Sequence, residues 1–386
     1  MSIRLGQAFY GTGSLRQNQK FSFLLRALVI LGVAVLGCSE GSSRSTCAPV
    51  PQVQDSSRKT ARPRDIGLVL SSGGCKGAYH LGVWKALDEA GLADRIGVIS
   101  GTSIGALCSA LFVSTGDPKV QERAWTETTT VLTLNPDPSD IARIYAREAA
   151  RQRTRYGVTE LPPQMTNHLW QAAEEEARHA LMPRIARACR ELAENPDTTN
   201  LLFGAMSPEP LRRRLEKLLP DAFPADGPVV YASALKCGKE REVRAFCLND
   251  LDRKTRVDAL CASAAIPVAF PPVEIDGALW QDGGWAERGG EGTPLSPILA
   301  NHPEIKTVVV VYLNDDRHLP LSLRARIRRR AETAGKRLVE IVPSRNIGGP
   351  FNGWFGVFDS SPETRRDLIA WGYDDAKKAF AGLNVR

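Results

Sequence analysis

Gly101-Thr-Ser-Ile-Gly105 follows the apolar run 96–99 and leads into a run of small and apolar residues, 106–112. An apolar strand, a G-x-S-x-G pattern and a helix, in that order, are typical of a nucleophile elbow. In such an elbow a tight turn exposes the serine side chain at the start of the helix, so only glycine fits two residues before and after it. The pattern makes Ser103 a candidate nucleophile. It is common by itself, and its meaning depends on the segments around it.

A second glycine-rich turn lies one strand upstream. Residues 66–70 predict a short buried strand, Ser71-Ser-Gly-Gly-Cys-Lys-Gly77 follows, and apolar spacing predicts a helix from 78 to about 90. Backbone N–H groups at such a turn bind anions. The phosphate-loop pattern is absent, and the dinucleotide pattern G-x-G-x-x-G is broken at Ser72. Because consecutive strand-to-helix turns of a parallel sheet share one edge, this turn is expected to bind the oxyanion of an attacked ester carbonyl.

A carboxylate completes the pattern far downstream. Residues 274–280 predict a hairpin whose turn is Asp276-Gly277, and Trp280-Gln-Asp-Gly-Gly284 follows. Asp282 is expected at a strand end, where the two glycines allow the backbone to come close to a neighbour. A carboxylate at that place can accept the proton of Ser103.

These segments together resemble the patatin-like phospholipase family. The resemblance rests on SSGGCKGAYHLGV (71–83), GTSIG (101–105), ASAAIPVAFPPVEIDG (262–277), QDGG (281–284) and the helix-forming tail 358–377. It covers roughly residues 65–379. It implies a three-layer α/β fold, in which a mainly parallel sheet carries helices on both faces. It also implies hydrolysis of acyl esters by a Ser–Asp dyad with no metal or other cofactor.

The resemblance also implies a role for each motif residue. Ser103 is the expected nucleophile, Asp282 the expected general base, and the main-chain amides around Gly73, Gly74 and Cys75 the expected oxyanion hole. The supporting motif positions are Ser72, Lys76, Gly77, Gly101, Gly105, Gly283 and Gly284. An ordinary aspartate, with a pKa of roughly 3.9, is a weak base. The dyad therefore requires a desolvated site that raises this pKa.

Two positions depart from the family pattern G-G-G-x-R-G. Ser72 stands at the first glycine, where a Cβ is expected to cause modest strain if the backbone has positive φ. Lys76 stands at the arginine and lacks its rigid bidentate fork. These departures leave open a non-catalytic protein that binds lipid or a protein partner. An acyltransferase that uses the same serine is a further alternative, and so is a Ser–Asp–His triad through His302 or His318, which both follow Asp282.

The N-terminal residues indicate targeting rather than folding. Residues 1–26 carry four basic residues and no acid, and the apolar run 27–36 is too short to span a bilayer comfortably. The run ends in Val35-Leu-Gly-Cys38, which resembles a bacterial lipoprotein signal with cleavage before a lipidated Cys38. An ordinary secretory signal and an uncleaved anchor are the alternatives. We therefore predict a signal peptide at 1–37, a flexible tether at 38–64 and one patatin-like domain at 65–386.

The charge and the signal bear on partners and location. The formal net charge is +7, and because residues 1–37 carry four basic residues and no acid, it falls to +3 after cleavage. Such a mild excess argues against a nucleic-acid partner. The expected partners are a phospholipid or other acyl-ester substrate, and a membrane reached through Cys38. The expected location is the bacterial cell envelope, with lipid anchoring at the outer membrane or periplasmic face favoured.

The middle of the chain predicts a helical insert between about 137 and 219, placed as a cap beside the sheet that either shapes an acyl-chain groove or only covers the sheet. Strands are expected again at 229–234, 242–248, 306–313 and 338–342. The eight cysteines show no metal-like spacing, and a disulfide between Cys237 and Cys247 is conceivable. The arginine-rich run 324–330 and the aromatic run 351–358 are candidate lipid contacts, with a solvated helix face and loop packing as their alternatives.

Overall fold

One mixed sheet organises the residues that the computed structural model describes, which are 63–129, 138–174, 176–177, 207–238, 242–267, 269–284, 290–348 and 362–381. The strands are β1 Ile66–Leu70, β2 Ile96–Thr102, β3 Val229–Lys236, β4 Val243–Cys247, β5 Val273–Ile275, β6 Ala278–Asp282, β7 Thr307–Val311 and β8 Arg337–Ile341. The signal, the tether up to residue 62 with Cys38, the middle of the insert at 178–206 and the aromatic run 351–358 lie outside the described residues.

Hydrogen-bonded neighbours in the sheet follow the path β5-β6-β3-β2-β1-β7-β8, and β4 pairs with the other edge of β3. Strands β8, β7, β1, β2 and β3 pair in parallel, whereas β4, β5 and β6 are antiparallel additions. Ile66 at the start of β1 lies opposite Ile96 on one side and Thr307 on the other, so the central strands begin level. Their carboxyl ends therefore meet at one edge. The expected mainly parallel α/β sheet is confirmed.

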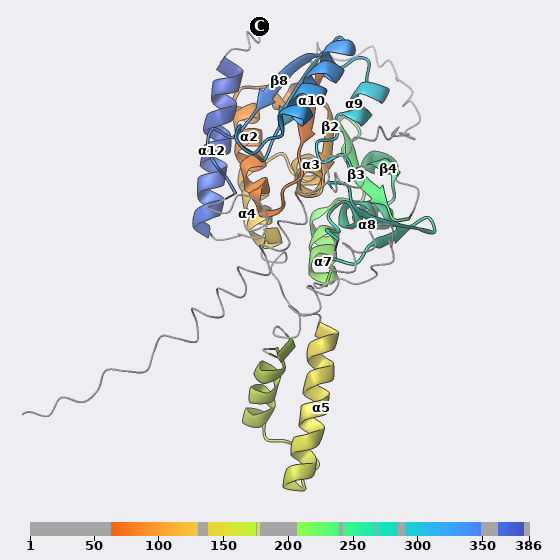
Figure 1. Ribbon diagram of the computed structural model, residues 1–386, viewed down its shortest axis with the longest axis vertical. Helices are drawn as coiled ribbons and strands as arrows, with labels where there is room; N and C mark the ends of the chain where they lie inside the picture. The colour runs from red at the N-terminus through yellow and green to blue at the C-terminus, as the bar shows by residue number, and fades with distance from the viewer. Residues whose placement is uncertain are drawn as a thin grey trace, which may run out of the picture.

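Helices cover both faces of the sheet (Figure 1). They are α2 Ala78–Glu89, α3 Ile104–Ser114, α4 Pro118–Thr129, α5 Pro138–Tyr156, α7 Glu209–Leu218, α8 Arg253–Ser263, α9 Ser296–Asn301, α10 Leu321–Thr333 and α12 Pro362–Ala381. One buried cluster joins the sheet to α2, α3, α7, α8 and α12. A second cluster joins its other face to α9 and α10. The result is three layers.

Strand β1 shows why the central strands are apolar throughout. Leu68 and Leu70 belong to the first cluster, while Val69 between them belongs to the second. Since successive side chains point to opposite faces, a strand covered on both sides needs apolar residues at every position. Burial of each such aliphatic side chain contributes roughly 1.5–3 kcal/mol to the free energy of unfolding.

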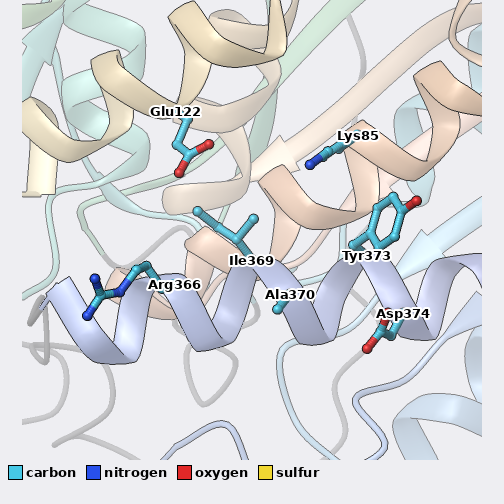
Figure 2. A pocket seen from close by; sticks show the side chains of 7 residues that line it. All are labelled: Lys85, Glu122, Arg366, Ile369, Ala370, Tyr373 and Asp374. Atoms are coloured by element: carbon cyan, nitrogen blue, oxygen red, sulfur yellow. The ribbon is translucent and has the colours of Figure 1, made fainter.

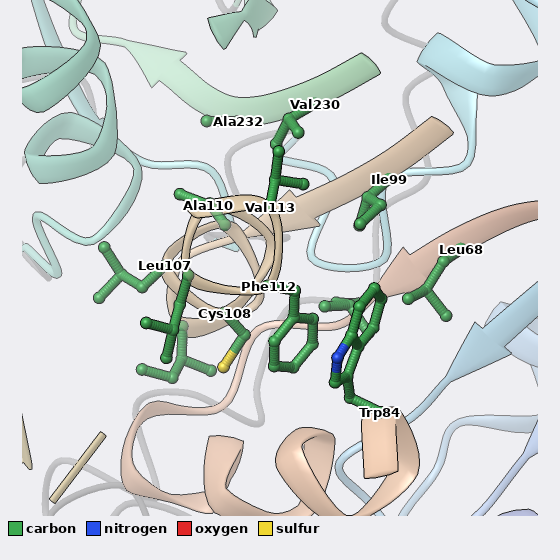
Figure 3. Close-up of a cluster of buried hydrophobic side chains, with 14 of the residues drawn as sticks. Leu68, Trp84, Ile99, Leu107, Cys108, Ala110, Phe112, Val113, Val230 and Ala232 are labelled. Carbon is green, nitrogen blue, oxygen red and sulfur yellow. The ribbon is translucent and has the colours of Figure 1, made fainter. Parts of the chain in front are cut away.

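Helix α3 lies in the middle of the first cluster (Figure 3). Residues 104–113 are all buried, so this helix is apolar around its whole circumference. The ring of Phe112 stacks on Trp84 of α2, with ring centroids 4.5 Å apart. Because α3 begins directly after Ser103, this packing fixes the position of the elbow.

Helices α2 and α12 touch through glycines. A Cβ added at Gly82 would lie 2.0 Å from the carbonyl oxygen of Ile369, and one at Gly372 would lie 2.1 Å from that of Tyr79. The Tyr79 hydroxyl also donates to Asp375 Oδ2 at 3.0 Å. The predicted C-terminal helix is thus packed backbone to backbone against the helix that follows the first glycine turn.

The insert divides into two parts. Helix α7 contributes Leu211 and Leu215 to the first cluster, so it lies beside the sheet as expected. Helix α5 instead pairs with a helix at 163–174 to form a hairpin that stands away from the sheet (Figure 1). Four of its buried residues, Ile141, Ile144, Ala173 and Ala177, form a cluster of their own. The prediction of a cap beside the sheet is wrong for this hairpin, because its short apolar stripe is covered by its own partner helix.

The disulfide considered between Cys237 and Cys247 does not fit the sheet. Cys247 lies opposite Tyr231 near the start of β3, whereas Cys237 follows Lys236 at its other end. Six residues of extended chain, ~20 Å, separate the two positions along the ladder, too far for a disulfide.

No helix in the part of the chain that the structure describes has the length and apolar character of a membrane span.

Candidate active site

The turn between β2 and α3 holds Ser103 in a rare backbone conformation, with φ 56° and ψ −124°. Such a conformation costs about 1–3 kcal/mol in a residue other than glycine and persists only where the surroundings impose it. A Cβ on Gly101 would lie 2.3 Å from the Gly105 carbonyl oxygen, and one on Gly105 would lie 2.1 Å from the Leu70 carbonyl oxygen. Both flanking glycines are therefore required by backbone contact, as the elbow pattern predicts.

A second serine, which the sequence analysis assigned no role, supports the elbow. The Ser103 backbone N–H donates to Ser263 Oγ at 2.9 Å, and the Ser263 hydroxyl donates to the Ser233 carbonyl at 2.7 Å. Ser263 is the last residue of α8. It thus ties the amide of Ser103 to β3 through two hydrogen bonds.

Strand β3 brings Ser103 and Asp282 together. Along one of its edges β3 pairs with β2 up to Thr102, which lies opposite Ser233, and then with β6 from Asp282, which lies opposite Ala234. Strands β2 and β6 run in opposite directions relative to β3, so their carboxyl ends meet end to end. Ser103 directly follows Thr102, and it therefore lies beside the last residue of β6.

The Asp282 carboxylate is buried and hydrogen-bonded. It accepts a hydrogen bond from the Ser103 hydroxyl, and its Oδ1 accepts one from the Gly284 N–H at 2.7 Å. Burial raises the pKa of Asp282 to about 6, and the hydrogen bonds from Ser103 and Gly284 oppose this rise in part. Only 5% of Asp282 and 4% of Ser103 is exposed. The carboxylate therefore has the desolvated surroundings that the sequence analysis required of a base.

The upstream glycine turn is a short 3-10 helix, Gly74–Gly77. Positive φ occurs here at Gly74, with a value of 57°, whereas the non-glycine residues with positive φ in the described part of the chain are Ser103 and Asp276. The strain expected at Ser72 is therefore wrong, because the left-handed residue of this turn is still a glycine. A Cβ at Gly73 would lie 2.7 Å from Leu313 Cδ1, and one at Gly77 would lie 2.4 Å from Ile104 Cγ1.

The glycine turn lies against the elbow and offers N–H donors. Gly77 packs on Ile104, and Gly105 packs on the carbonyl oxygens of Leu70 and Ser71. Within the residues that the structure describes, no acceptor is assigned to the N–H of Gly73 or Gly74. Two adjacent backbone donors beside a serine hydroxyl are suited to a developing oxyanion.

The Ser72 side chain lies beside the aspartate. Its Oγ and Asp282 Oδ1 are 2.8 and 2.9 Å from the place that a Cβ on Gly284 would take. The Ser72 N–H donates to the Gly292 carbonyl at 2.8 Å. Glycines at 284 and 292 thus make room for the serine that replaces the family's first glycine.

Lys76 is buried and joins the glycine turn to the loop after β7. Its Nζ donates to the Leu313 carbonyl and to Asn314 Oδ1, each at 3.0 Å. Burial lowers the pKa of Lys76 to about 8, while the nearby Asp315 carboxylate opposes this change. A single ammonium group therefore makes both contacts here without a guanidinium fork.

The segment 290–293 contacts both the glycine turn and the end of β2 before the elbow. Besides accepting from Ser72, it accepts a hydrogen bond from Thr102 Oγ1 through the Glu291 carbonyl at 2.7 Å. Ser71 Oγ and Thr293 Oγ1 are 2.9 Å apart. No motif marks these contacts, which link the ends of β1 and β2.

The histidines contact other groups. His302 precedes β7, at the amino end of the parallel strands, where its ring bonds to Tyr231 and Glu304. His318 bonds to Asp315, and the buried His80, whose pKa burial lowers to about 4, bonds to the Ser71 carbonyl at 3.0 Å. No described histidine is among the groups that shift the pKa of Asp282. His302 lies about 15 Å of strand away from the edge with Ser103, so a triad through it is wrong.

Other candidate contacts lie away from this edge. On α10, Arg324 and Arg328 pair with Glu340, and Arg330 pairs with Glu291, so these arginines are compensated by the protein itself. An open pocket of about 290 Å³ lies between α2, α4 and α12 and contains none of the predicted site residues (Figure 2). Among the described residues, no group of three or more His, Cys, Asp or Glu side chains is arranged to hold a metal ion.

A serine on a strained strand-to-helix turn, at the carboxyl edge of a mainly parallel sheet and beside a buried carboxylate, defines an α/β protein with a nucleophile-elbow site. Residues 68–291 match a family model described as "Patatin-like phospholipase". The chain belongs to the patatin-like phospholipase family.

Similarity to individual proteins is local in sequence. The chain is 48% identical over 54 residues to "Lysophospholipase NTE1" of Coccidioides immitis, covering 14% of this chain and 3% of that protein. It is 53% identical over 49 residues to "Neuropathy target esterase sws" of Drosophila persimilis, covering 13% of this chain and 3% of that protein. The chain thus matches only a small fraction of the length of these relatives.

Similarity in structure extends further along the chain. VipD from Legionella pneumophila is 18% identical and has a TM-score of 0.43, covering 83% of this chain and 67% of VipD. Human GIVD cytosolic phospholipase A2 is 11% identical and has a TM-score of 0.38, covering 82% of this chain and 59% of that protein.

Proposed function

We propose that the protein hydrolyses acyl esters of lipids, as a phospholipase A or related esterase, with Ser103 as nucleophile and Asp282 as general base. The observation that carries this proposal is the pairing of β3, which sets Asp282 directly against Ser103. The raised pKa of Asp282, about 6, gives a carboxylate that is ionised at neutral pH and still basic enough to accept a proton. The family assignment supports the same class of substrate.

The reaction proceeds in two acyl-transfer steps. Ser103 Oγ attacks the ester carbonyl carbon while its proton passes to Asp282, and the N–H groups around Gly73, Gly74 and Cys75 bind the oxyanion. The carbon–oxygen bond to the alcohol then breaks, and the alcohol leaves with the proton from Asp282. Water attacks the resulting acyl-enzyme, gives its proton to Asp282, and the free acid leaves as Ser103 regains that proton.

The test uses a fluorogenic short-chain ester with a chelator present, and compares the native chain with Ser103→Ala and Ser114→Ala. Both serines belong to the same turn-and-helix unit, but Ser114 lies at the far end of α3. We expect Ser103→Ala to lower kcat by a factor on the order of 10³ or more, and Ser114→Ala to leave it nearly unchanged. A fluorophosphonate probe is expected to label Ser103, as located by peptide mass spectrometry.

The outcomes separate the alternatives. Lipid binding without turnover, unaffected by Ser103→Ala, would establish the non-catalytic lipoprotein instead. Formation of new ester faster than free acid when a lysolipid acceptor is added would establish the acyltransferase. Full turnover in Asp282→Asn would remove the dyad from the mechanism.

We also propose that residues 1–37 are a lipoprotein signal, that Cys38 carries the lipid, and that 38–64 tether the domain at 65–386 to the bacterial envelope. The supporting observations are the basic start, the ten-residue apolar run and the Leu36-Gly-Cys38 ending. Radiolabelled palmitate incorporated into the native chain and not into Cys38→Ser is the expected result. Equal labelling, or a mature N-terminus other than Cys38, would contradict it.

A further inference from the structure

The hairpin made by α5 and the helical residues 163–174 and 176–177, called here the helical arm, ends far from the sheet (Figure 1). The chain turns between the two helices at residues 157–162, so the last residues of α5 and this turn form the outer end of the arm. Residues 153–160 are all exposed. The outer end is thus a surface that the rest of the described protein does not cover.

Charge is unevenly distributed along the arm. Nearer the sheet its arginines are compensated, since Arg143 pairs with Asp140 and Arg147 crosses to Glu176. At the outer end, Arg153 and Arg155 have no carboxylate partner among the described residues. Residues 151–170 contain three arginines and one acidic residue, whereas 174–176 are three glutamates. The outer end is therefore basic and the inner end acidic.

The arm also exposes apolar surface. Tyr156 is 55% exposed, Val158 41% and Trp170 40%, and these are three of the four large hydrophobic residues that are exposed in the described chain. The Arg155 guanidinium lies over the Tyr156 ring, 5.8 Å from its centroid. Arginine combined with an aromatic ring suits an interface that is anionic and polar outside and apolar within, because both side chains are amphipathic.

We propose that the outer end of the helical arm, residues 153–158, docks the protein on an anionic phospholipid surface. The proposal rests on the proposed function, since a lipid substrate lies in such a surface. Uncompensated arginines are attracted to anionic headgroups, and the exposed Tyr156 and Val158 enter the boundary between headgroups and acyl chains. An acidic protein would use Arg153 and Arg155 but leave this apolar surface exposed, so lipid is the better match.

The test measures cosedimentation of the protein with two kinds of vesicle. One contains phosphatidylcholine with roughly 30% phosphatidylglycerol, and the other contains phosphatidylcholine alone. The mature chain, residues 38–386, carries Cys38→Ser and Ser103→Ala, so that the signal, an attached lipid and hydrolysis do not affect binding. We expect Arg153→Gln/Arg155→Gln to lower partitioning onto the anionic vesicles by roughly 20-fold. Tyr156→Ser is expected to lower partitioning onto both kinds of vesicle.

The matched control is Arg326→Gln/Arg329→Gln, which removes the same charge from two exposed arginines of α10. It is expected to change partitioning less than twofold. Equal partitioning of the arm variant and the parent chain, or a loss in the α10 variant alone, overturns the proposal. The proposal is also overturned if Arg153→Gln/Arg155→Gln loses binding to immobilised polyglutamate but keeps its binding to vesicles. That result assigns an acidic protein partner to the arm.

A soluble monomeric ester separates this proposal from the proposed function. With Ser103 and Cys38 restored, Arg153→Gln/Arg155→Gln is expected to turn over that ester at the native rate and to lose rate only on anionic vesicles. Failure of Ser103 as nucleophile would leave the vesicle-binding result unchanged. Failure of the arm would leave turnover of the soluble ester unchanged.

Discussion

Ser103 and Asp282 are each held in a state that costs free energy, and contacts with the rest of the fold stabilise that state. Ser103 occupies a strained backbone conformation, and Asp282 holds a carboxylate where only 5% of the residue is exposed. Strain and a raised pKa are typical of catalytic groups, which have to be positioned and tuned rather than merely stable. Ser263 shows how the strain is sustained, because it holds the Ser103 amide and is itself held by β3.

The raised pKa of Asp282 predicts a pH dependence of both rate and stability. The rate, kcat/KM on a soluble ester, should rise as pH increases through about 6, where the carboxylate ionises. The folded pKa lies above the unfolded one, so the stabilisation from protonated Asp282 is complete below about pH 4 and is lost as pH rises through about 6. Asp282→Asn should therefore be inactive and, at pH 7.5, more stable by roughly 1–3 kcal/mol.

Chemical denaturation at pH 4.5 and pH 7.5 checks this expectation, with Ser103→Ala as the inactive comparison. The gain of Asp282→Asn should appear at the higher pH and shrink at the lower one. An Asn variant that is less stable than the native chain at pH 7.5 contradicts the assigned cost of burying the charge.

At the scale of elements, close backbone contact decides which residues are tolerated. Helices α2 and α12 are in backbone contact at Gly82 and Gly372. The apolar residues of α12 that belong to the main buried cluster are Leu368, Ala376 and Phe380. Helix α2 in turn packs on α3 through Trp84 and Phe112. The C-terminal helix therefore supports the elbow through one intermediate helix.

Gly372→Ala should destabilise the protein by about 3 kcal/mol, because its Cβ would lie 2.1 Å from the Tyr79 carbonyl oxygen and force the helices apart. Gly116→Ala is the control, since nothing lies within 4 Å of its Cβ position. Urea unfolding followed by circular dichroism measures both variants. Similar midpoints for the two would show that α12 can shift without cost.

Local sequence patterns predicted most helices and strands, but they did not predict the contacts between segments that are distant in the sequence. Strand β1, the elbow at Ser103 and the turn at Asp276-Gly277 were predicted where the structure has them, because each depends on neighbouring residues alone. The role of Ser263 and the double pairing of β3 depend on which strands lie side by side, and no residue spacing encodes that. The helical arm was misplaced for a similar reason, since an apolar stripe does not reveal what will cover it.

For the whole molecule, the described core has separate parts. Two clusters lie on opposite faces of the sheet and share its strands, whereas the cluster of the helical arm contains residues of the arm alone. The arm and the sheet are thus expected to respond differently to the loss of buried side chains.

Ile99→Ala in β2 should lower the free energy of unfolding by roughly 2–5 kcal/mol and reduce turnover, because its side chain is fully buried in the cluster that holds α3, the helix of the elbow. Ile144→Ala in α5 should leave the main unfolding transition and the turnover of a soluble ester close to native, and loosen only the arm. Hydrogen exchange resolved by peptide, together with calorimetry, distinguishes these results. A large drop in the main transition for Ile144→Ala would show that the arm and the sheet unfold together.

The end-to-end meeting of β2 and β6 along β3 has a consequence for the newly made chain. Ser103 and Asp282 are brought together only after β3 has paired on that edge with both strands, and β6 is the later one in the sequence. A ribosome-bound chain that has emerged only as far as β4 contains Ser103 but not Asp282, the proposed base. Since pairings between distant segments form slowly, the proposed pair of Ser103 and Asp282 is expected to assemble late in folding, and turnover should appear only after β6 has paired.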